Sequence, residues 1–403
     1  MTSANTPSLA KRSLIPHALV SLLFGYTILI TGNGLLSTLV SLRLIQAESS
    51  PVVISLVQSA YYVGLTLGAL SGGVLIGRVG HHRAFVTFAA VAAICALGYT
   101  ASNAPLVWVC IRFVTGLCLV GIFNVVESWL NEVSTNTQRG RVFSTYLVVN
   151  YLGVGAGQFL IGLADTTGFA LFAIASALFS ASLIPLAIAG QHACPTTNHA
   201  TSGSQLTLGL SGLRTVYRDA PLGLLGCLAA GLLTSSFFTM QPVFMRMVGY
   251  PVADVAHFMG IALIAALVPQ WPVARLADHF DRRRIIAGVA LLASSCSLLL
   301  FLFHHPVVIQ TLGYLYVSLI FTLYGLAISY VNDCIPSNQR VPVSAGLLLI
   351  FSLGGSAGPT LVSATMARVG PAGLYLFTAL VAGALSLLTL RSLRAVPVAG
   401  GVL

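Results

Sequence analysis

Two ionisable residues stand inside one long apolar stretch, and their types and spacing make them the first candidates for chemistry. Arg112, Gly116, Leu119, Phe123 and Glu127 recur at helical spacing, so a helix would place them on one broad face. At a rise of about 1.5 Å per residue, Arg112 and Glu127 lie about 22 Å apart and cannot pair directly. Placing a charged side chain in hydrocarbon costs about 2.5–3.5 kcal/mol on insertion scales. Each of these two residues is therefore expected to have a function if its side chain faces a cavity.

The chemistry that these two residues could perform differs. A carboxyl group in a partly dry cavity can take up and release protons, so Glu127 is predicted to carry a proton or to contact a substrate. The alternative is a structural carboxylate that caps a loop and pairs with Arg139 or Arg141. Arg112 could hold the carboxylate of a substrate.

Amide and aromatic side chains in the same apolar stretches form a second group of candidates. Buried amides and phenols need hydrogen-bond partners, which either a solvated pathway or a neighbouring helix can supply. The predicted cavity-lining residues are Tyr26, Asn33, Gln58, Tyr61, Tyr62, Phe123, Asn124, Asn150, Gln158, Gln241 and Tyr324.

The elements that must position these residues follow from the composition. Hydrophobic residues make up 57% of the 403 residues and charged residues only 7%, whereas a soluble domain has about a quarter charged. Stretches long enough to cross about 30 Å of hydrocarbon recur along the chain. We predict twelve spans, at roughly 14–42, 52–76, 84–103, 106–131, 142–163, 168–190, 220–245, 253–274, 285–303, 306–331, 342–366 and 372–391.

The two halves of the chain carry the same local patterns at a fixed offset of 201 residues. The stretch 73–83 aligns with 274–284, Gln138-Arg139 with Gln339-Arg340, and 153–158 with 354–359. Such parallel repeats are typical of secondary transporters. We therefore expect an all-α membrane protein of twelve transmembrane helices in two six-helix bundles related by pseudo-twofold symmetry.

The domain organisation follows from the longest polar interval. We expect a first bundle at 1–190, a cytoplasmic linker rich in Ser, Thr, Gly and Pro at 191–219, and a second bundle at 220–403. The remaining connections are short, which leaves no room for a water-soluble domain.

Loop residues at the repeated motif suggest a conformational latch. Glycines let a helix end and the backbone turn at once, and neighbouring Arg side chains can meet acidic groups. The alternative is a basic turn that only sets topology. The predicted latch residues are Gly73, Arg78, Gly80, Arg83, Glu132, Asp278 and Arg283, with Glu132 as the partner of the first loop.

Glycines on two corresponding spans suggest moving helices. They thin a helix locally, and a proline inside a span removes a backbone donor and favours a kink. The alternative is static close packing of small residues. The predicted hinge residues are Gly153, Gly157, Gly354, Gly358 and Pro359.

The basic residues predict the orientation. If both termini are cytoplasmic, fifteen of the nineteen Lys and Arg residues fall on inner segments, in agreement with the positive-inside rule. The net charge of +10 is spread over many loops, which disfavours a nucleic-acid-binding face. We expect a multi-pass protein of a bacterial inner membrane.

Several classes of protein are disfavoured. No phosphate-binding loop motif occurs, and the intramembrane acids are too few for an enzyme, so neither ATP hydrolysis nor a cofactor is expected. The seven cysteines lack metal-ligand spacing and are expected to pack as small apolar residues. His81 and His82 are expected to be solvated loop residues, not a metal site.

Several motifs carry a family resemblance. Gly73 to Arg83 resembles the loop 2–3 motif of the major facilitator superfamily, and 274–284 resembles its second copy, although Gly77 and Asp281 depart from the pattern. Arg112-x-x-x-Gly116 is similar to the fourth-helix motif of proton-coupled members. The stretch 153–158 resembles the fifth-helix motif of proton:drug antiporters, with Gln158 in place of Pro.

One group within that superfamily is especially similar. The stretches Val126-Glu127-Ser128, Arg139-Gly140-Arg141 and Gln270-Trp271-Pro272 resemble the YcaD-like group. The resemblance implies the major facilitator fold and alternating access.

The function expected is secondary active transport of small molecules, coupled to protons and carried out by a monomer. Efflux of amphipathic or cationic compounds is slightly favoured. The alternative is a proton symporter or uniporter that imports a small metabolite such as a carboxylate, a sugar or a siderophore-like compound. A passive channel is disfavoured because Glu127 corresponds to Ile328 in the repeat.

Overall fold

Long α-helices dominate the computed structural model of this chain. It describes residues 14–133, 139–189, 205–303, 305–336 and 339–395, although not the side chains at 14–18, 70–77, 133, 139–141, 189, 205–209, 340–341 and 394–395. In chain order the elements are α1 (Leu14–Gln46), α2 (Pro51–Val79), α3 (His81–Gly98), α4 (Pro105–Val133), α5 (Arg139–Phe159), η2 (Leu160–Leu163), α6 (Ala170–Ala181), α7 (Leu183–Ala189), α8 (Gln205–Asp219), α9 (Pro221–Met247), α10 (Val252–Ala265), α11 (Gln270–His279), α12 (Arg282–Leu302), α13 (Pro306–Cys334), α14 (Arg340–Val369) and α15 (Gly373–Ala395).

Twelve segments of the described chain are helical and apolar over a length sufficient to cross a membrane. Three of them combine two elements, namely α5 with η2, α6 with α7, and α10 with α11. The twelve predicted spans are therefore confirmed. Helices suit this solvent because each backbone donor and acceptor finds a partner within its own segment.

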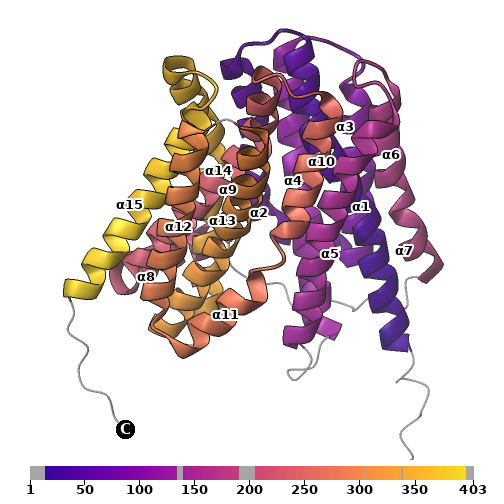
Figure 1. The fold of residues 1–403 in the computed structure, drawn as a ribbon. Coiled ribbons are helices and arrows are strands. Elements are labelled where there is room, and N and C mark those ends of the chain that lie inside the picture. The colour runs from indigo at the N-terminus through magenta and orange to yellow at the C-terminus, as the bar shows by residue number, and fades with distance from the viewer. Residues whose placement is uncertain (1–13, 134–138, 190–204, 304, 337–338, 396–403) are drawn as a thin grey trace, which may run out of the picture.

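The helices form two groups that meet along the middle of the molecule. Figure 1 shows α1 to α7 in indigo to magenta mainly on one side, and α9 to α15 in rose to yellow mainly on the other. The groups touch chiefly where α2 meets α14, where α5 meets α10, and where α1 meets α9. We refer to these groups as the N-bundle and the C-bundle.

Equivalent glycine contacts show the repeat in three dimensions. A Cβ added to Gly157 on α5 would lie 2.2 Å from the carbonyl oxygen of Thr31 on α1. A Cβ on Gly358 of α14 would lie 2.7 Å from the carbonyl oxygen of Leu232 on α9. Both members of the second pair follow the first by 201 positions. The crossing of α1 with α5 is thus repeated by α9 with α14.

The contacts between the bundles concentrate at one end. Helix α1 begins and α15 ends at the lower end in Figure 1, which we call the terminal end, and the opposite end is the far end. In the far half, Ser363 donates a hydrogen bond to Ser55 at 3.1 Å, and the Ser59 and Thr360 hydroxyls lie 3.3 Å apart. The backbones of α5 and α10 also approach closely here, because a Cβ added to Gly155 would lie 3.3 Å from the carbonyl oxygen of Gly260. These far-end contacts constitute a seal.

The predicted linker contains a helix. Residues 205–219 form α8, which contacts α14 and α2 and therefore touches both bundles. The buried positions Gly212 and Val216 are four residues apart, so they lie on one face of α8. Gly212 lies so close to Pro342 that no side chain fits between them. The linker boundaries themselves remain a prediction.

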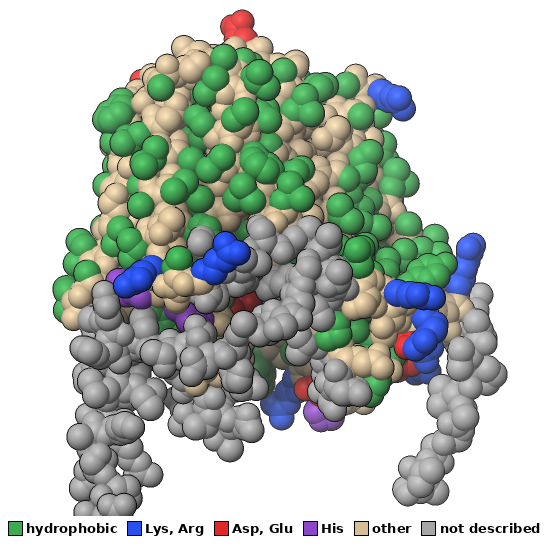
Figure 2. All heavy atoms as spheres, turned by 180° about the vertical axis from the view of Figure 1, so that it is seen from behind, with side chains coloured by type: hydrophobic (Ala, Val, Ile, Leu, Met, Phe, Trp, Pro, Cys, Tyr) green, Lys and Arg blue, Asp and Glu red, His purple; other side chains and the backbone are tan. Residues whose placement is uncertain are grey.

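Charged side chains gather towards the terminal end. Figure 2 shows an apolar body above a lower rim where Arg, His and acidic side chains occur. The described Arg side chains of that end belong to Arg78, Arg83, Arg214, Arg218, Arg275, Arg282, Arg283, Arg284 and Arg391.

We predict that Gly157→Ala destabilises the protein because the added methyl group would overlap the backbone of α1. Overpacking of this kind costs about 1–3 kcal/mol. The matched control is Gly288→Ala on α12, where nothing lies within 4 Å of the added atom. The control should be neutral or stabilising by about 0.4–1 kcal/mol. Thermal unfolding of the purified variants in detergent measures the difference, and equal melting temperatures would contradict the packing argument.

Candidate functional site

A central cavity lies between the two bundles, below the far-end seal. One part has a volume of about 240 Å³ and an adjoining part about 200 Å³. The two parts share Asn150, Val154, Thr234, Phe238 and Phe351. Helices of both bundles therefore contribute to one continuous wall.

The repeat places equivalent residues around this cavity. Five pairs of positions 201 residues apart each have both members in the cavity wall. These pairs are Asn33 with Thr234, Ser37 with Phe238, Tyr62 with Leu263, Phe123 with Tyr324, and Asn150 with Phe351. The N-bundle members are mostly polar, whereas the C-bundle members are mostly apolar or aromatic, so the cavity has one polar wall and one apolar wall.

Arg112 is the charged residue of the polar wall. Its side chain is 2% exposed, and its Nε and Nη2 atoms donate to Gln58 Oε1 at 3.0 and 2.8 Å. The guanidinium also lies over the ring of Tyr61, 4.6 Å from the centroid. Arg112 Nη1 is buried without a hydrogen-bond partner in the described structure. A cation is thus held by neutral groups alone.

Gln58 links this cation to a contact between the two bundles. Its Nε2 donates to the Ser37 carbonyl oxygen at 3.0 Å and to Ser41 Oγ at 2.6 Å. Ser41 Oγ in turn donates to the carbonyl oxygen of Thr239 on α9 at 3.3 Å. The network connects the cavity to a contact between the bundles.

Glu127 lies nearer the terminal end of the same helix. Its Oε1 accepts a hydrogen bond from Tyr146 on α5 at 3.3 Å. Tyr324, on α13 of the C-bundle, is close enough to interact electrostatically with the carboxylate. Glu127 is exposed by surface area, although many protein atoms surround its carboxylate. It is not part of the cavity wall itself.

Tyrosines connect Glu127 to the cavity. The rings of Tyr26 and Tyr146 lie with centroids 5.1 Å apart. Tyr26 donates to Asn150 Oδ1 at 2.6 Å, and Asn150 lines both parts of the cavity. Tyr26 is therefore a buried support of the wall and not one of its lining residues.

Three other predicted lining residues also lie outside the cavity wall. Gln158 donates to the Gly34 carbonyl oxygen at 2.9 Å and so joins α5 to α1. Gln241 is bonded to Tyr375 inside the C-bundle. Asn124 has a buried Nδ2 without a partner among the described residues. Gln158 and Gln241 therefore form hydrogen bonds to a neighbouring helix, which was the alternative to lining a solvated pathway.

The predicted lining residues Asn33, Gln58, Tyr61, Tyr62, Phe123, Asn150 and Tyr324 do lie in the cavity wall. Their roles towards a substrate remain predictions.

The predicted hinge glycines pack within the bundles. Gly153 and Gly157 contact α1, and Gly354 and Gly358 contact α9. The neighbouring Gly355 faces the other bundle, where a Cβ would lie 2.6 Å from the Tyr62 ring. Pro359 lies inside α14, which is continuous from Arg340 to Val369. The close packing is therefore visible, while motion remains a prediction.

The first loop differs from the expected latch. Glu132 lies 4.0 Å from His81 Nε2, and no ion pair joins it to Arg78 or Arg83, whose side chains are described. His81 is 1% exposed and its Nε2 lies 2.8 Å from Ser128 Oγ, so the expectation of a solvated histidine is wrong. The burial arises because His81 is the first residue of α3, on the side that packs against α4.

Two glycines of that motif have a local explanation. Gly73 lies within α2, and Gly80 stands between α2 and α3 with φ +83°. Such a positive φ favours glycine because a side chain there would be strained. In the second copy Asp281 has φ −54° and instead caps α12, accepting a hydrogen bond from the Arg283 backbone.

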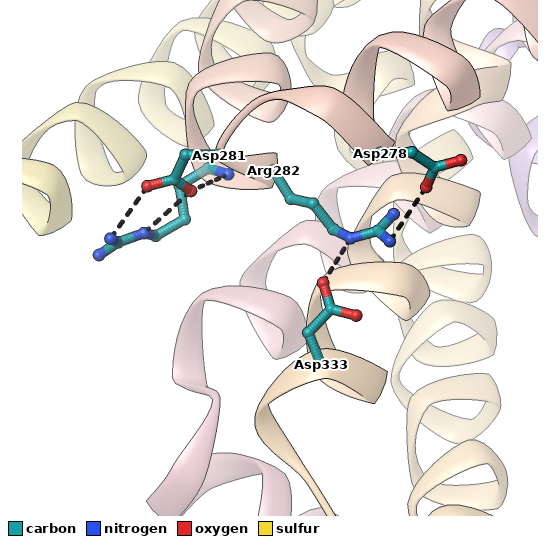
Figure 3. Close-up of polar contacts among 5 residues, drawn as sticks. Asp278, Asp281, Arg282 and Asp333 are labelled. Carbon is teal, nitrogen blue, oxygen red and sulfur yellow. Dashed lines mark hydrogen bonds and ion pairs between the residues drawn. The ribbon is translucent and has the colours of Figure 1, made fainter. Parts of the chain in front are cut away.

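The acidic and basic residues of the second copy pair within the C-bundle. Figure 3 shows Arg282 between Asp278 and Asp333, and these ion pairs tie α11 and α12 to the end of α13. Arg283 pairs with Asp281 at 3.1 Å. Partial burial raises the pKa of Asp281, but hydrogen bonds from Arg283 outweigh it and hold this pKa below its usual value. In this conformation, Asp278 and Arg283 contact no residue of the N-bundle by hydrogen bond or ion pair within the described chain.

Sequence reasoning missed several residues of the site. Ser37, Thr234, Phe238 and Thr239 line the cavity, and Tyr146 holds Glu127. The signal for Thr234 and Phe238 was present, because each lies 201 positions after a polar residue of the first bundle. Nothing in the sequence indicated the role of Tyr146, because its hydrogen bond to Glu127 depends on how α4 and α5 pack against each other.

The twelve apolar helices and the cavity between the two bundles indicate the class of multi-pass membrane transporters. The model of the Major Facilitator Superfamily matches residues 22–340. The chain therefore belongs to the major facilitator superfamily, and the predicted fold class and family are confirmed.

Relatives of similar length share part of the sequence. The "Uncharacterized MFS-type transporter YcaD" of Escherichia fergusonii is 28% identical over 385 residues, 95% of this chain and 97% of the relative. The protein of the same name in Escherichia coli O6:K15:H31 (strain 536) is 28% identical over 374 residues, 92% of this chain and 94% of the relative. The chain is an integral membrane transporter whose substrate these relatives do not reveal.

Two solved structures share the fold. A point mutant of the nucleoside transporter NupG has a TM-score of 0.78 at 12% identity over 93% of this chain and 100% of that one. A bacterial homologue of the human lysosomal transporter Spinster, in an inward-facing and unoccupied conformation, has a TM-score of 0.75 at 13% identity. That match covers 95% of this chain and 98% of the other.

We predict that Gln58→Leu destabilises the protein more than Gln241→Leu does. Both glutamines are 1% exposed, but Gln58 bonds a cation and Gln241 bonds a neutral phenol. Hydrogen bonds to charged groups contribute about 1.5–3 kcal/mol and neutral ones about 0.5–1.5 kcal/mol. Thermal unfolding in detergent tests this order. A larger loss for Gln241→Leu would show that Arg112 does not depend on Gln58.

Proposed function

We infer that the protein is a secondary active transporter in which the two bundles alternately open the central cavity to either side of the membrane. The position of the cavity carries this proposal. It lies between the two bundles, and in the described chain the contacts that seal it lie at the far end. Hydroxyl pairs and glycines form that seal, and such contacts can separate at modest cost because each is individually weak. The site is built from one chain, which is consistent with a functional monomer.

The arginine distribution supports a cytoplasmic terminal end. Nine described Arg side chains belong to that end, whereas Arg43, Arg246 and Arg368 belong to the far end. Short loops rich in Arg remain on the cytoplasmic side. Both termini are then cytoplasmic, the membrane is the bacterial inner membrane, and the conformation described is open to the cytoplasm.

Proton coupling through Glu127 is supported by its surroundings. Glu127 is exposed, and the bond of its carboxylate to Tyr146 makes it part of a line of groups that ends at Asn150 in the cavity. Protonation of Glu127 would remove a negative charge from between the bundles. A change of that charge can favour one conformation over the other, which is what coupling requires.

The two expected substrate classes draw on different parts of the site. The aromatic C-bundle wall, with Phe238, Phe321 and Phe351, suits an amphipathic compound, as expected for efflux. The charge in the cavity wall is the positive one of Arg112, which suits the carboxylate of the import alternative. Direction of transport depends on gradients and not on this geometry.

We predict that Glu127→Gln abolishes accumulation driven by a pH gradient while exchange of substrate across the membrane continues. The amide keeps the shape of the side chain but cannot carry a proton. Flux into proteoliposomes, measured with and without an imposed pH gradient, tests this with substrates selected by thermal-shift screening of metabolites and drugs.

Glu132→Gln is the matched control, because Glu132 lies on the same helix but beside His81 and away from the tyrosines. It should retain gradient-driven accumulation. Full accumulation by Glu127→Gln would contradict the proton role, and loss of exchange as well would assign Glu127 to substrate binding instead.

A further inference from the structure

We propose that the cavity binds a small organic anion, namely a monocarboxylate with an apolar or aromatic body, and that Arg112 is its charge partner. This inference rests on the proposed function, since it names the substrate class of the same cavity. It replaces the slight preference for cationic compounds that the sequence alone suggested.

The first argument is the balance of charge. All nine acidic residues of the chain lie in the described part, and none forms an ion pair with Arg112. Glu127 lies about 22 Å away along α4, too far to neutralise it. A buried cation without a counter-charge is unfavourable in a low-dielectric site. A bound anion would supply the missing charge.

The second argument is the unused hydrogen-bonding capacity. Gln58 occupies Arg112 Nε and one N–H of Nη2. Nη1 is buried without a hydrogen bond in the described structure, and the Tyr99 phenol is close enough to interact with the guanidinium. The remaining edge of the guanidinium, formed by Nη1 and Nη2, has the spacing that a carboxylate matches with two parallel hydrogen bonds. Asn33 Oδ1 is a second buried atom of the same wall without a partner. It can accept from a hydroxyl or amide on the ligand.

The third argument concerns the rest of the ligand. Besides its polar residues, the same cavity has a wall formed by Phe238, Phe351 and Val154, which offer apolar contact and no charge. A highly charged or sugar-like compound would leave polar groups unpaired against this surface. The two adjoining volumes, about 240 and 200 Å³, suit a compound with one ring or a short chain.

The binding site is also connected to a contact between the two bundles. A carboxylate that draws Arg112 towards it would weaken the bonds to Gln58, and Gln58 supports Ser41 where it donates to Thr239 of the other bundle. Occupancy by an anion therefore has a direct route to the contact that must open during transport.

The experiment uses sets of ligands that differ in charge but not in size. Benzoate, benzamide and benzylammonium form one set, and phenylacetate with its amide and amine analogues forms a second. Equilibrium binding of each compound to the purified full-length protein in detergent is measured at constant ionic strength. We expect the anion of a set to bind at least tenfold more tightly than its neutral and cationic partners.

Variants assign the preference to Arg112. Arg112→Gln should lower the affinity for the anion at least tenfold and remove the preference, whereas Arg112→Lys should retain a preference for the anion. Arg246→Gln is the control, since Arg246 bonds the Tyr250 carbonyl oxygen at the far end and is not part of the cavity wall. If Arg112→Gln does not fold, the ligand sets still show whether the unaltered protein prefers anions. In addition, Asn33→Leu should weaken the binding of a hydroxylated anion such as mandelate more than that of phenylacetate.

Equal binding within the sets, tighter binding of the cations, or an anion affinity that Arg112→Gln leaves unchanged would overturn this inference. None of these results would affect gradient-driven transport of another compound. Conversely, if these anions bind through Arg112 but the protein moves neither them nor any compound selected by the thermal-shift screen across a proteoliposome membrane, the proposed function is refuted and the anion site stays intact.

Discussion

The structure depends on how one buried cation is held. Arg112 has no acidic partner within the described chain, so Gln58 and the face of Tyr61 provide its stabilisation. Gln58 can do this only while its own amide nitrogen is held by Ser37 and Ser41. Because Ser41 also donates to Thr239, the stabilisation of the cation is linked to one hydrogen bond between the bundles. The cavity wall is therefore hydrogen-bonded to a contact between α1 and α9.

Duplication gave the two bundles the same crossings but different chemistry. Gly157 against Thr31 and Gly358 against Leu232 show that the backbone geometry is shared. Arg112 corresponds to Gly313, and Glu127 corresponds to Ile328, so the N-bundle alone carries these two ionisable groups. The C-bundle retains the shape of the wall and contributes apolar surface. The N-bundle thus places the charge in the cavity wall, while the C-bundle contributes a mainly apolar face.

The sequence predicted what periodicity and length can specify. Twelve spans, two bundles, the family and the intramembrane position of Arg112 followed from apolar runs, the 201-residue repeat and the motifs. It could not assign partners, because the direction of a side chain on a helix that is apolar all round depends on packing. Hence Gln158 and Gln241 were placed in the cavity although they join helices, and His81 was placed in solvent although α4 covers it. Glu132 was matched with Arg side chains for the same reason.

The central claim is that the far-end contact between α2 and α14 must open during transport. Ser55 and Ser363 meet there with their hydroxyl oxygens 3.1 Å apart, so cysteines at both positions can form a disulfide that holds the bundles together. The reference pair is Ser294 with Gly383 inside the C-bundle, where the β-carbons would lie 3.9 Å apart, a distance suited to a disulfide. The decisive measurement is flux into proteoliposomes for Ser55→Cys/Ser363→Cys and Ser294→Cys/Gly383→Cys, before and after reduction, in a background without the native cysteines. The account predicts that the oxidised cross-bundle pair is inactive and recovers on reduction, while the pair inside the C-bundle is active in both states. Undiminished flux with the cross-bundle disulfide formed would contradict it.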